Sequence, residues 1–240
     1  MNIFGIDMEN VSREELFGRI RQFLDEPTYH QVATVNPEFL LEAERDPAFR
    51  AVLRSCDLRT VDGSGIVLAG LLRGERLRRY PGADLMEDLL ALAEHEGKSI
   101  FFAANRMGLS SFADISEAVR RRFPRISFDG RDIDFEKIGQ EWTNAGTAEI
   151  VFCNAGTPIQ ELFLAGLRAH PGSARLGIGV GGAFDFLTGK RRRAPERMRS
   201  LGIEWLWRLV WEPWRAKRIW KSTAVFLWKT AMNKKIPADR

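Results

Sequence analysis

The sequence predicts an α/β fold: a mainly parallel, Rossmann-like sheet with helices on both faces and a basic, tryptophan-rich helical appendage at the C-terminus. Short apolar runs alternate along the chain with longer segments of helical pattern. This alternation is typical of βαβ units, whose strands pair in parallel. The 240 residues suffice for one large domain with an appendage, and we place the boundary between residues 1–190 and 191–240.

Local signals mark where the expected elements begin. Ser12-Arg13-Glu14-Glu15 is a capping box, so a helix should start there and run to about Leu24. Asn36-Pro37 places an N-cap before a proline at the first helical position. The expected strands are residues 31–35, 58–61, 99–104, 126–128, 149–153 and 176–180, and the other helices are 64–72, 83–96, one ending near 123 and one ending near 170.

Polar residues stand where two expected strands end, and ligands of parallel sheets bind beyond the carboxyl ends of the strands. Thr34 and Asn36 could hydrogen-bond a sugar or phosphate, although Asn36 alone reads more simply as an N-cap. Asp62 follows the next strand and opens a glycine-rich helix start. A carboxylate on such a rigid turn can act as a general base. Asp62 as a helix cap is an equally good interpretation of the pattern.

Two further segments suggest phosphate or nucleotide binding. Arg79 could pair with a departing diphosphate, because guanidinium groups match phosphate oxygens, but most of the arginines around it read as a solvated charge run. Gly177–Gly182 satisfies G-x-G-x-x-G, yet it comes late in the chain and no acidic second strand follows it. We interpret it as a loop that lets a nucleotide approach the backbone, with Asp185 near enough to bond a ribose or base.

The residues that usually hold metals give little support for a metal site. Asp132-Ile133-Asp134 matches the D-x-D pattern of metal-dependent glycosyltransferases, but three-residue patterns arise easily by chance. We expect this run to begin a helix, where acidic residues favour the macrodipole. The two cysteines and three histidines have no metal-ligand spacing, and two cysteines make no disulfide framework. We therefore predict no metal and no cofactor.

Charge is divided unevenly along the chain. Residues 188–240 hold 15 of the lysines and arginines, only 4 acidic residues and six of the seven tryptophans, for a net charge of +11, whereas the rest carries −7. Segregation of this kind usually marks a polyanionic partner. The N-terminus has no basic region of a signal peptide, and no apolar run approaches the ~20 residues that span a bilayer. We therefore expect a cytoplasmic protein.

The tail is the most distinctive segment of the sequence. Pro213 divides it, and a helix starting at Trp214 would be amphipathic, basic on one face and aromatic on the other. That pattern favours a helix lying on an anionic membrane, with packing against the body or a second subunit as the alternative. Nucleic acid is less favoured, because no nucleic-acid module surrounds the tryptophans. The apolar face has Ala216, Ile219, Trp220, Thr223, Phe226 and Leu227; the basic face has Arg215, Arg218, Lys221 and Lys229.

An ordered set of motifs is spread from about Gly5 to Arg218. The motifs are Thr34-Val-Asn36-Pro37-Glu38, Asp62-Gly63-x-Gly65, Arg79-x-x-Gly82-x-Asp84-Leu85-Met86, Gly156-x-Pro158-x-Gln160-Glu161, Gly179-Val-Gly181-Gly182-Ala-Phe184-Asp185-Phe186, Gly189 with Arg193-Ala194-Pro195, Leu201-Gly202-x-Glu204-Trp205-x-x-Arg208-Leu, and Glu212-Pro213-x-Arg215. Any one motif is weak, but the set in this order is specific. It resembles the WecG/TagA/CpsF family of bacterial glycosyltransferases.

The resemblance implies an inverting, metal-independent enzyme of cell-surface polysaccharide synthesis. It would move a sugar from a UDP-sugar to a polyprenyl-diphosphate-linked saccharide at the inner face of the bacterial membrane. Asp62 matches the proposed base, and Thr34, Asn36, Arg79 and Gln160 match other residues implicated in the reaction. The nucleotide would lie near Ala104, Gly130, Arg131, Gly181, Gly182 and Asp185, and Arg208, Arg215 and Arg218 match an appendage that closes over the site and touches the membrane.

Three departures from the family pattern lie near the expected donor site. Ala103-Ala104-Asn105-Arg106-Met107-Gly108 replaces a glycine-rich loop, Ile159 replaces a lysine, and Arg131 replaces an aromatic residue. They leave the donor open among N-acetylmannosamine, its uronic acid, glucose, glucuronic acid and galactose. A non-catalytic, membrane-bound UDP-nucleotide-binding regulatory module and a Rossmann-type oxidoreductase remain alternatives. A homo-oligomer also stays open.

Overall fold

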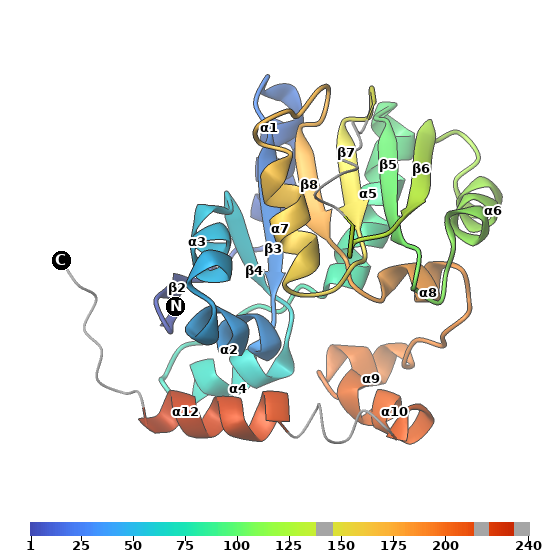
Figure 1. Cartoon of the computed structure of the whole chain (residues 1–240). Coiled ribbons are helices and arrows are strands. Elements are labelled where there is room, and N and C mark those ends of the chain that lie inside the picture. Colours follow the sequence, from blue (N-terminus) through green and yellow to red (C-terminus); the bar gives the residue numbers. More distant parts are fainter. Residues whose placement is uncertain (138–145, 214–220, 233–240) are drawn as a thin grey trace.

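Six of the expected apolar runs form strands of one parallel sheet. The computed structural model describes residues 1–137, 146–213 and 221–232. Across the sheet the order is β4-β3-β8-β7-β5-β6, and each neighbouring pair is parallel (Figure 1). The predicted fold class is confirmed. The strands are β3 (His30–Val35), β4 (Leu58–Val61), β5 (Ile100–Asn105), β6 (Phe128–Ile133), β7 (Ile150–Cys153) and β8 (Leu176–Gly179).

Helices cover both faces of the sheet because successive strand residues point to opposite sides. Ile100 and Phe102 pack into the core beneath α1 (Arg13–Asp25), α5 (Gly82–Glu96), α6 (Phe112–Arg122) and α8 (Ala183–Leu187). Phe101 and Ala103, on the other face, pack toward α7 (Ile159–Gly166). On that same face, α2 (Pro37–Arg45), α3 (Pro47–Ser55) and α4 (Ser64–Leu71) enclose a third core, which a hairpin of β1 (Asn2–Ile3) and β2 (Ile6–Asp7) completes.

The predicted helix starts are present. Ser12 Oγ accepts the Glu15 N–H and the Glu15 carboxylate accepts the Ser12 N–H, which closes the capping box of α1. Asn36 Oδ1 accepts the Glu38 N–H at 2.9 Å at the start of α2. Each cap is worth about 1 kcal/mol. Asn36 therefore does cap a helix, as its sequence position suggested.

The segment around Asp132 is the clearest departure from the sequence prediction. We expected a strand at 126–128 and a helix beginning at Asp132. Instead β6 continues to Ile133, and Asp132 lies opposite Ala104 of β5. This strand is at the edge of the sheet, so its alternate polar side chains remain exposed, and their charge hid the strand in the sequence pattern.

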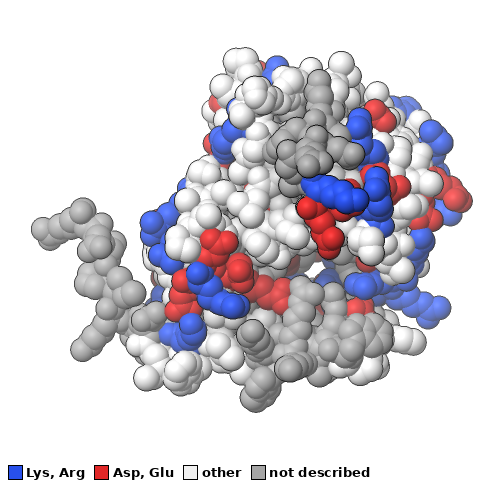
Figure 2. Space-filling view, viewed as in Figure 1, with Lys and Arg blue, Asp and Glu red and all other residues white. Residues whose placement is uncertain are grey.

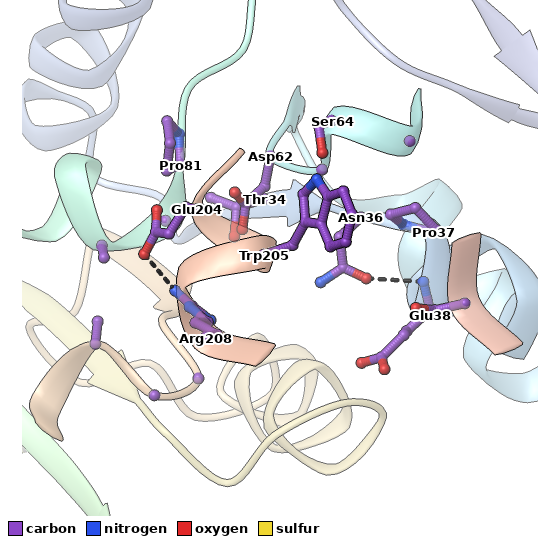
Figure 3. Close-up of a pocket in the computed structure, with 18 of the residues that line it drawn as sticks. Thr34, Asn36, Pro37, Glu38, Asp62, Ser64, Pro81, Glu204, Trp205 and Arg208 are labelled. Carbon is purple, nitrogen blue, oxygen red and sulfur yellow. Dashed lines mark hydrogen bonds and ion pairs between the residues drawn. The ribbon is translucent and has the colours of Figure 1, made fainter. Parts of the chain in front are cut away.

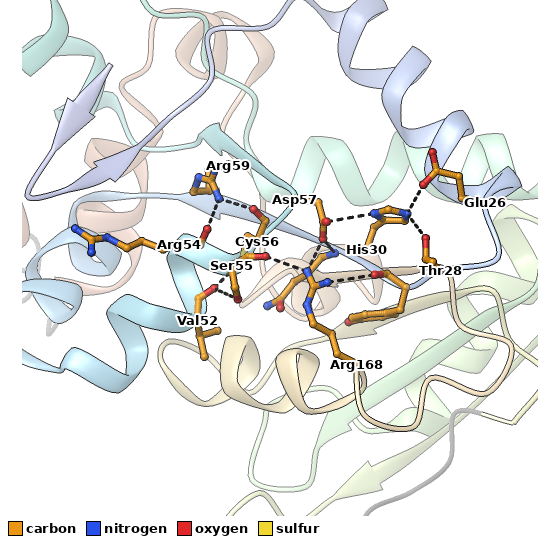
Figure 4. A network of polar contacts seen from close by, with 12 residues as sticks. Glu26, Thr28, His30, Val52, Arg54, Ser55, Cys56, Asp57, Arg59 and Arg168 are labelled. Carbon is orange, nitrogen blue, oxygen red and sulfur yellow. Dashed lines mark hydrogen bonds and ion pairs between the residues drawn. The ribbon is translucent and has the colours of Figure 1, made fainter. Parts of the chain in front are cut away.

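A polar network joins elements at the amino ends of β3 and β4 (Figure 4). Asp57 Oδ2 accepts the Gln31 N–H at 2.8 Å and pairs with Arg168 at 2.5 Å. His30 lies between Glu26 and Asp57 and stacks on Phe23 at 4.2 Å between ring centroids. Burial raises the pKa of Asp57, but the Gln31 N–H and the Arg168 guanidinium lower it more, so the net pKa is below its ordinary value.

The C-terminal residues form a layer below the carboxyl ends of the strands (Figure 1). It contains α9 (Glu196–Ser200), α10 (Glu204–Trp211), a π-helical segment Lys221–Val225 and α12 (Phe226–Met232). Phe226 is fully buried and meets Phe4 edge-to-face at 6.1 Å between centroids. The described part of the predicted apolar face thus packs on the body through Phe226, the alternative considered above. The domain boundary at residue 190 stays a prediction.

Candidate active site

A pocket of about 530 Å³ lies beyond the carboxyl ends of β3, β4 and β8, between the body and α10. Thr34 and Asp62 at the strand ends line it together with Glu204, Trp205 and Arg208 of α10 (Figure 3). Its position matches the general rule for parallel sheets. The pocket gathers eight of the predicted site residues: Thr34, Asn36, Asp62, Arg79, Gln160, Gly181, Gly182 and Arg208.

Asp62 stands at the end of β4, where its N–H donates to the Val35 carbonyl at 2.8 Å. The N-cap of α4 is Gly63 and has no side-chain cap bond, so the reading of Asp62 as a helix cap is wrong. Burial raises the pKa of the Asp62 carboxyl to about 6. Arg208, Arg79 and the Gly82 N–H lower that pKa, while Glu204 raises it.

Thr34 and Asn36 lie across from Asp62 on the neighbouring strand. Thr34 is buried, and its hydroxyl would be 2.8 Å from a Cβ at position 82, so the glycine at Gly82 lets α5 begin against it. Asn36 uses its side-chain oxygen to cap α2, and Figure 3 shows its nitrogen turned away from Glu38. Asn36 can therefore serve as a cap and still present an N–H₂ donor to the pocket that it lines.

Two arginines approach Asp62 from different parts of the chain. Arg79 donates to the Arg199 carbonyl in the C-terminal layer, and its backbone forms a bridge with Val61 of β4. Arg208, on α10, pairs with Glu204 at 2.8 Å and lies over the Phe186 ring. The Arg208 Nε is buried and has no hydrogen-bond partner within the described residues. Positive charge thus converges on the carboxylate from both walls of the pocket.

An ion network that we did not predict joins the appendage to the body. Asp84, in the first turn of α5, accepts Arg193 at 2.6 Å and Arg199 at 3.1 Å. Arg193 also lies 3.8 Å from Glu204, which is itself paired with Arg208. Asp84, Arg193 and Glu204 all occur in the motifs above, but only their spatial convergence distinguishes them from ordinary charged residues.

The glycines of the glycine-rich segment Gly177–Gly182 have two roles, close packing and lining the pocket. A Cβ at Gly177 would collide with the Tyr29 hydroxyl, and one at Gly179 would collide with Gln160 and Glu161, so these two glycines serve packing. Gly181 has a φ of +50° and lines the pocket, and a Cβ added there would meet nothing within 4 Å. Gly179 lines the pocket as well, together with Gly181 and Gly182, so Gly177 is the one glycine of the segment that serves packing alone.

Several predicted nucleotide contacts are not among the residues that line the pocket. Ala104 is fully buried within β5, and a Cβ at Gly130 would collide with the Phe102 carbonyl and the Phe112 ring. Arg131 is exposed and lies over the Phe101 ring. Asp185 accepts the Ser110 hydroxyl at 2.8 Å and pairs with Arg191, which does line the pocket. Their assignment stays a prediction, and Arg215 and Arg218 lie outside the described residues.

The D-x-D residues do not line the pocket either. Asp132 Oδ1 accepts the Phe112 N–H at 2.8 Å, and Asp134 pairs with Arg106 and Lys137. Both carboxylates are thus engaged in local structure. Across residues 1–137, 146–213 and 221–232, no group of three or more histidine, cysteine, aspartate or glutamate side chains could hold a metal ion.

Comparison with known proteins identifies the family of this chain. The model of the glycosyl transferase WecG/TagA/CpsF family matches residues 1–240. The chain belongs to this family. It is 34% identical over 203 residues to a protein of Bacillus spizizenii (82% of this chain, 77% of the relative) and 31% identical over 222 residues to one of Bacillus subtilis (90% and 85%). A protein of Staphylococcus aureus is 26% identical over 244 residues (98% and 93%). All three relatives are named N-acetylglucosaminyldiphosphoundecaprenol N-acetyl-beta-D-mannosaminyltransferase.

The family assignment confirms the resemblance derived from the ordered motifs. It also removes the oxidoreductase alternative, since the family is one of glycosyltransferases. No helix in the described part of the chain is long and apolar enough to cross a bilayer.

Proposed function

We propose that this chain transfers a sugar, of the N-acetylmannosamine type, from a UDP-sugar to an N-acetylglucosamine-bearing polyprenyl diphosphate, with inversion and without a metal. The names of the three relatives support the sugar and acceptor class. One observation carries the proposal: Asp62 faces Arg79 and Arg208 in a pocket at the strand ends. A base beside two cations suits a reaction that removes a proton and releases a diphosphate.

In the proposed reaction, Asp62 takes the proton from an acceptor hydroxyl. The hydroxyl oxygen forms a bond to the anomeric carbon as the bond from that carbon to the UDP oxygen breaks on the opposite face, which inverts the configuration. The proton stays on Asp62 and the electron pair leaves with UDP. A pKa of about 6 suits this step, because the carboxylate is mostly ionised near neutral pH yet basic enough to accept the proton.

The leaving diphosphate gains one negative charge close to the arginines. Arg208 has a buried Nε without a hydrogen-bond partner among the described residues, and a phosphate oxygen could accept from it. Arg79 approaches from the body. Preorganised donors of this kind can each contribute roughly 3 kcal/mol to transition-state stabilisation. The Gly181–Gly182 turn supplies the open backbone against which the nucleotide would lie. Arg215 and Arg218 are proposed to add charge from the appendage.

The appendage is proposed to dock on the anionic inner surface of the cell membrane, where the acceptor lipid lies. Exposed apolar side chains support this: Trp211 and Trp228 are 56% and 63% exposed, and Met232 is 72% exposed. Apolar side chains at this density on an appendage are typical of interfacial contact. On the face in Figure 2, described basic side chains are interspersed with acidic ones.

The experiment that tests the proposal is acceptor-dependent UDP release from a panel of UDP-sugars, with a short-chain polyprenyl diphosphate carrying N-acetylglucosamine. Release with one donor that persists in EDTA is the expected result. Loss of release in EDTA would refute the metal-independent mechanism. UDP binding without release from any donor would favour the non-catalytic alternative.

A further inference from the structure

Gln160, a predicted site residue, makes contacts that differ from those of a residue reaching into a pocket. Its side chain is only 3% exposed. Its Oε1 accepts the Gly156 N–H and the Gly181 N–H, both at 3.1 Å. Both of these glycines line the pocket and have positive φ angles, +81° and +50°. One amide oxygen thus ties together the turn after β7 and the turn after β8.

The nitrogen of the Gln160 side-chain amide also needs a hydrogen-bond partner. Two backbone N–H groups require the oxygen on their side, so the nitrogen must face an acceptor elsewhere. Glu161 Oε1 supplies that acceptor at 2.6 Å from Gln160 Nε2. Gly179 makes room for both side chains, because a Cβ at this position would collide with Gln160 and Glu161.

Glu161 is an unusual residue to find in this place. It is 2% exposed, and its second oxygen, Oε2, is buried with no hydrogen-bond partner among the described residues. Burial raises the pKa of its carboxyl to about 8, although Gln160 and Thr157 hydrogen bonds lower it. The titratable groups that face it are the thiols of Cys56 and Cys153, which are buried too. A buried carboxyl without a cation costs stability, so packing alone does not explain it.

We propose that Glu161 is a positioning residue: it holds the Gln160 amide so that its oxygen fixes the Gly156 and Gly181 turns at the spacing that the donor diphosphate requires. This rests on the proposed function for the identity of the ligand. The geometric part, that Glu161 orders the two turns through Gln160, stands without it. Gln160 then acts by shaping the pocket wall.

Three variants separate positioning from general packing. Glu161→Met removes the acceptor but keeps a side chain of similar length, and Glu161→Gln retains an acceptor oxygen. Leu164→Ala is the matched control, because Leu164 is a fully buried residue of the same helix with no polar role. Amide hydrogen exchange at Gly156 and Gly181 is measured in the unliganded protein, and KM for the donor and kcat are measured with the acceptor.

Glu161→Met should speed exchange at both glycines at least tenfold and raise the donor KM about tenfold, with a smaller change in kcat. Glu161→Gln should restore both values, and Leu164→Ala should lower the melting temperature without moving either. Unchanged exchange at both glycines in Glu161→Met, or failure of Glu161→Gln to restore it, would overturn the proposal. If the wild type released no UDP, the proposed function would fail, while the exchange measurement would still decide the role of Glu161.

Discussion

The role of Asp62 can be tested through the pH dependence of turnover. A general base works only when ionised, so kcat/KM should rise with pH through the pKa of the free enzyme. With a pKa of about 6, Asp62 is ionised in about nine-tenths of molecules at pH 7 but about one-tenth at pH 5. Activity should therefore fall about tenfold between these values. An unperturbed aspartate, with a pKa near ~3.9, would lose less than about a tenth of its activity over the same interval.

Asp62→Asn keeps the shape of the side chain and removes the base. The expected loss in kcat is roughly 10²- to 10⁴-fold, and the acidic limb of the pH profile should disappear with it. UDP release would be followed from pH 4.5 to 8 with saturating acceptor. Near-normal turnover in Asp62→Asn, or an acidic limb centred near 4, would refute the assignment.

Thermal stability gives an independent check on the same carboxyl. Its pKa is raised in the folded state, so its contribution to stability is fully present below the unfolded pKa and is lost as pH rises through about 6. The loss is on the order of 3 kcal/mol for a shift of this size. Asp62→Asn should therefore melt higher than the wild type at pH 7.5, and this difference should shrink toward pH 4. A variant that melts lower at pH 7.5 would show that its lost activity reflects misfolding.

Three further predictions concern the amino-end network, the appendage and the diphosphate site. Asp57→Asn should lower the free energy of unfolding by about 2 kcal/mol, because it leaves Arg168 without its charged partner, and should leave the donor KM unchanged. Folding lowers the pKa of Asp57, so this loss of stability is present above the pKa of the unfolded state and disappears as pH falls through the pKa of the folded state. Urea titrations at pH 7 and pH 3 would measure it. A loss that persisted at pH 3 would contradict the ion-pair account. Phe226→Ala should destabilise the docking of α12 by about 3 kcal/mol and expose the tail to limited proteolysis. Trp228→Ala, at an exposed position, is the control and should leave docking and proteolysis unchanged. Arg208→Gln should reduce kcat about 10²-fold. Arg192 is exposed, stacks on Trp211 and does not line the pocket, so Arg192→Gln should leave kcat unchanged. Equal losses of kcat in the two variants would argue against a diphosphate role for Arg208.

Much of the fold is readable from the sequence because its signals are local. The capping box at Ser12 and the Asn36-Pro37 helix start act within a few residues, and apolar runs such as Ile150–Cys153 are buried wherever they pair. The β6 strand was misread because its polar residues become favourable only at an edge beside β5.

For the candidate site, the order of the motifs in the sequence was enough to determine the family. The alternation of strands and helices indicated that the site lies at the strand ends, since parallel strands place their carboxyl ends together. Only the tertiary structure decided which side chains meet. It separated Gly181 from Gly177, showed that Asp62 does not cap α4, and showed that Gln160, which lines the pocket, bridges two turns of its wall. It also brought Arg208 to Asp62 from 146 positions away in the sequence. Electrostatic coupling and backbone hydrogen bonds depend on distance in space, and nothing in the local pattern around either residue encodes that distance.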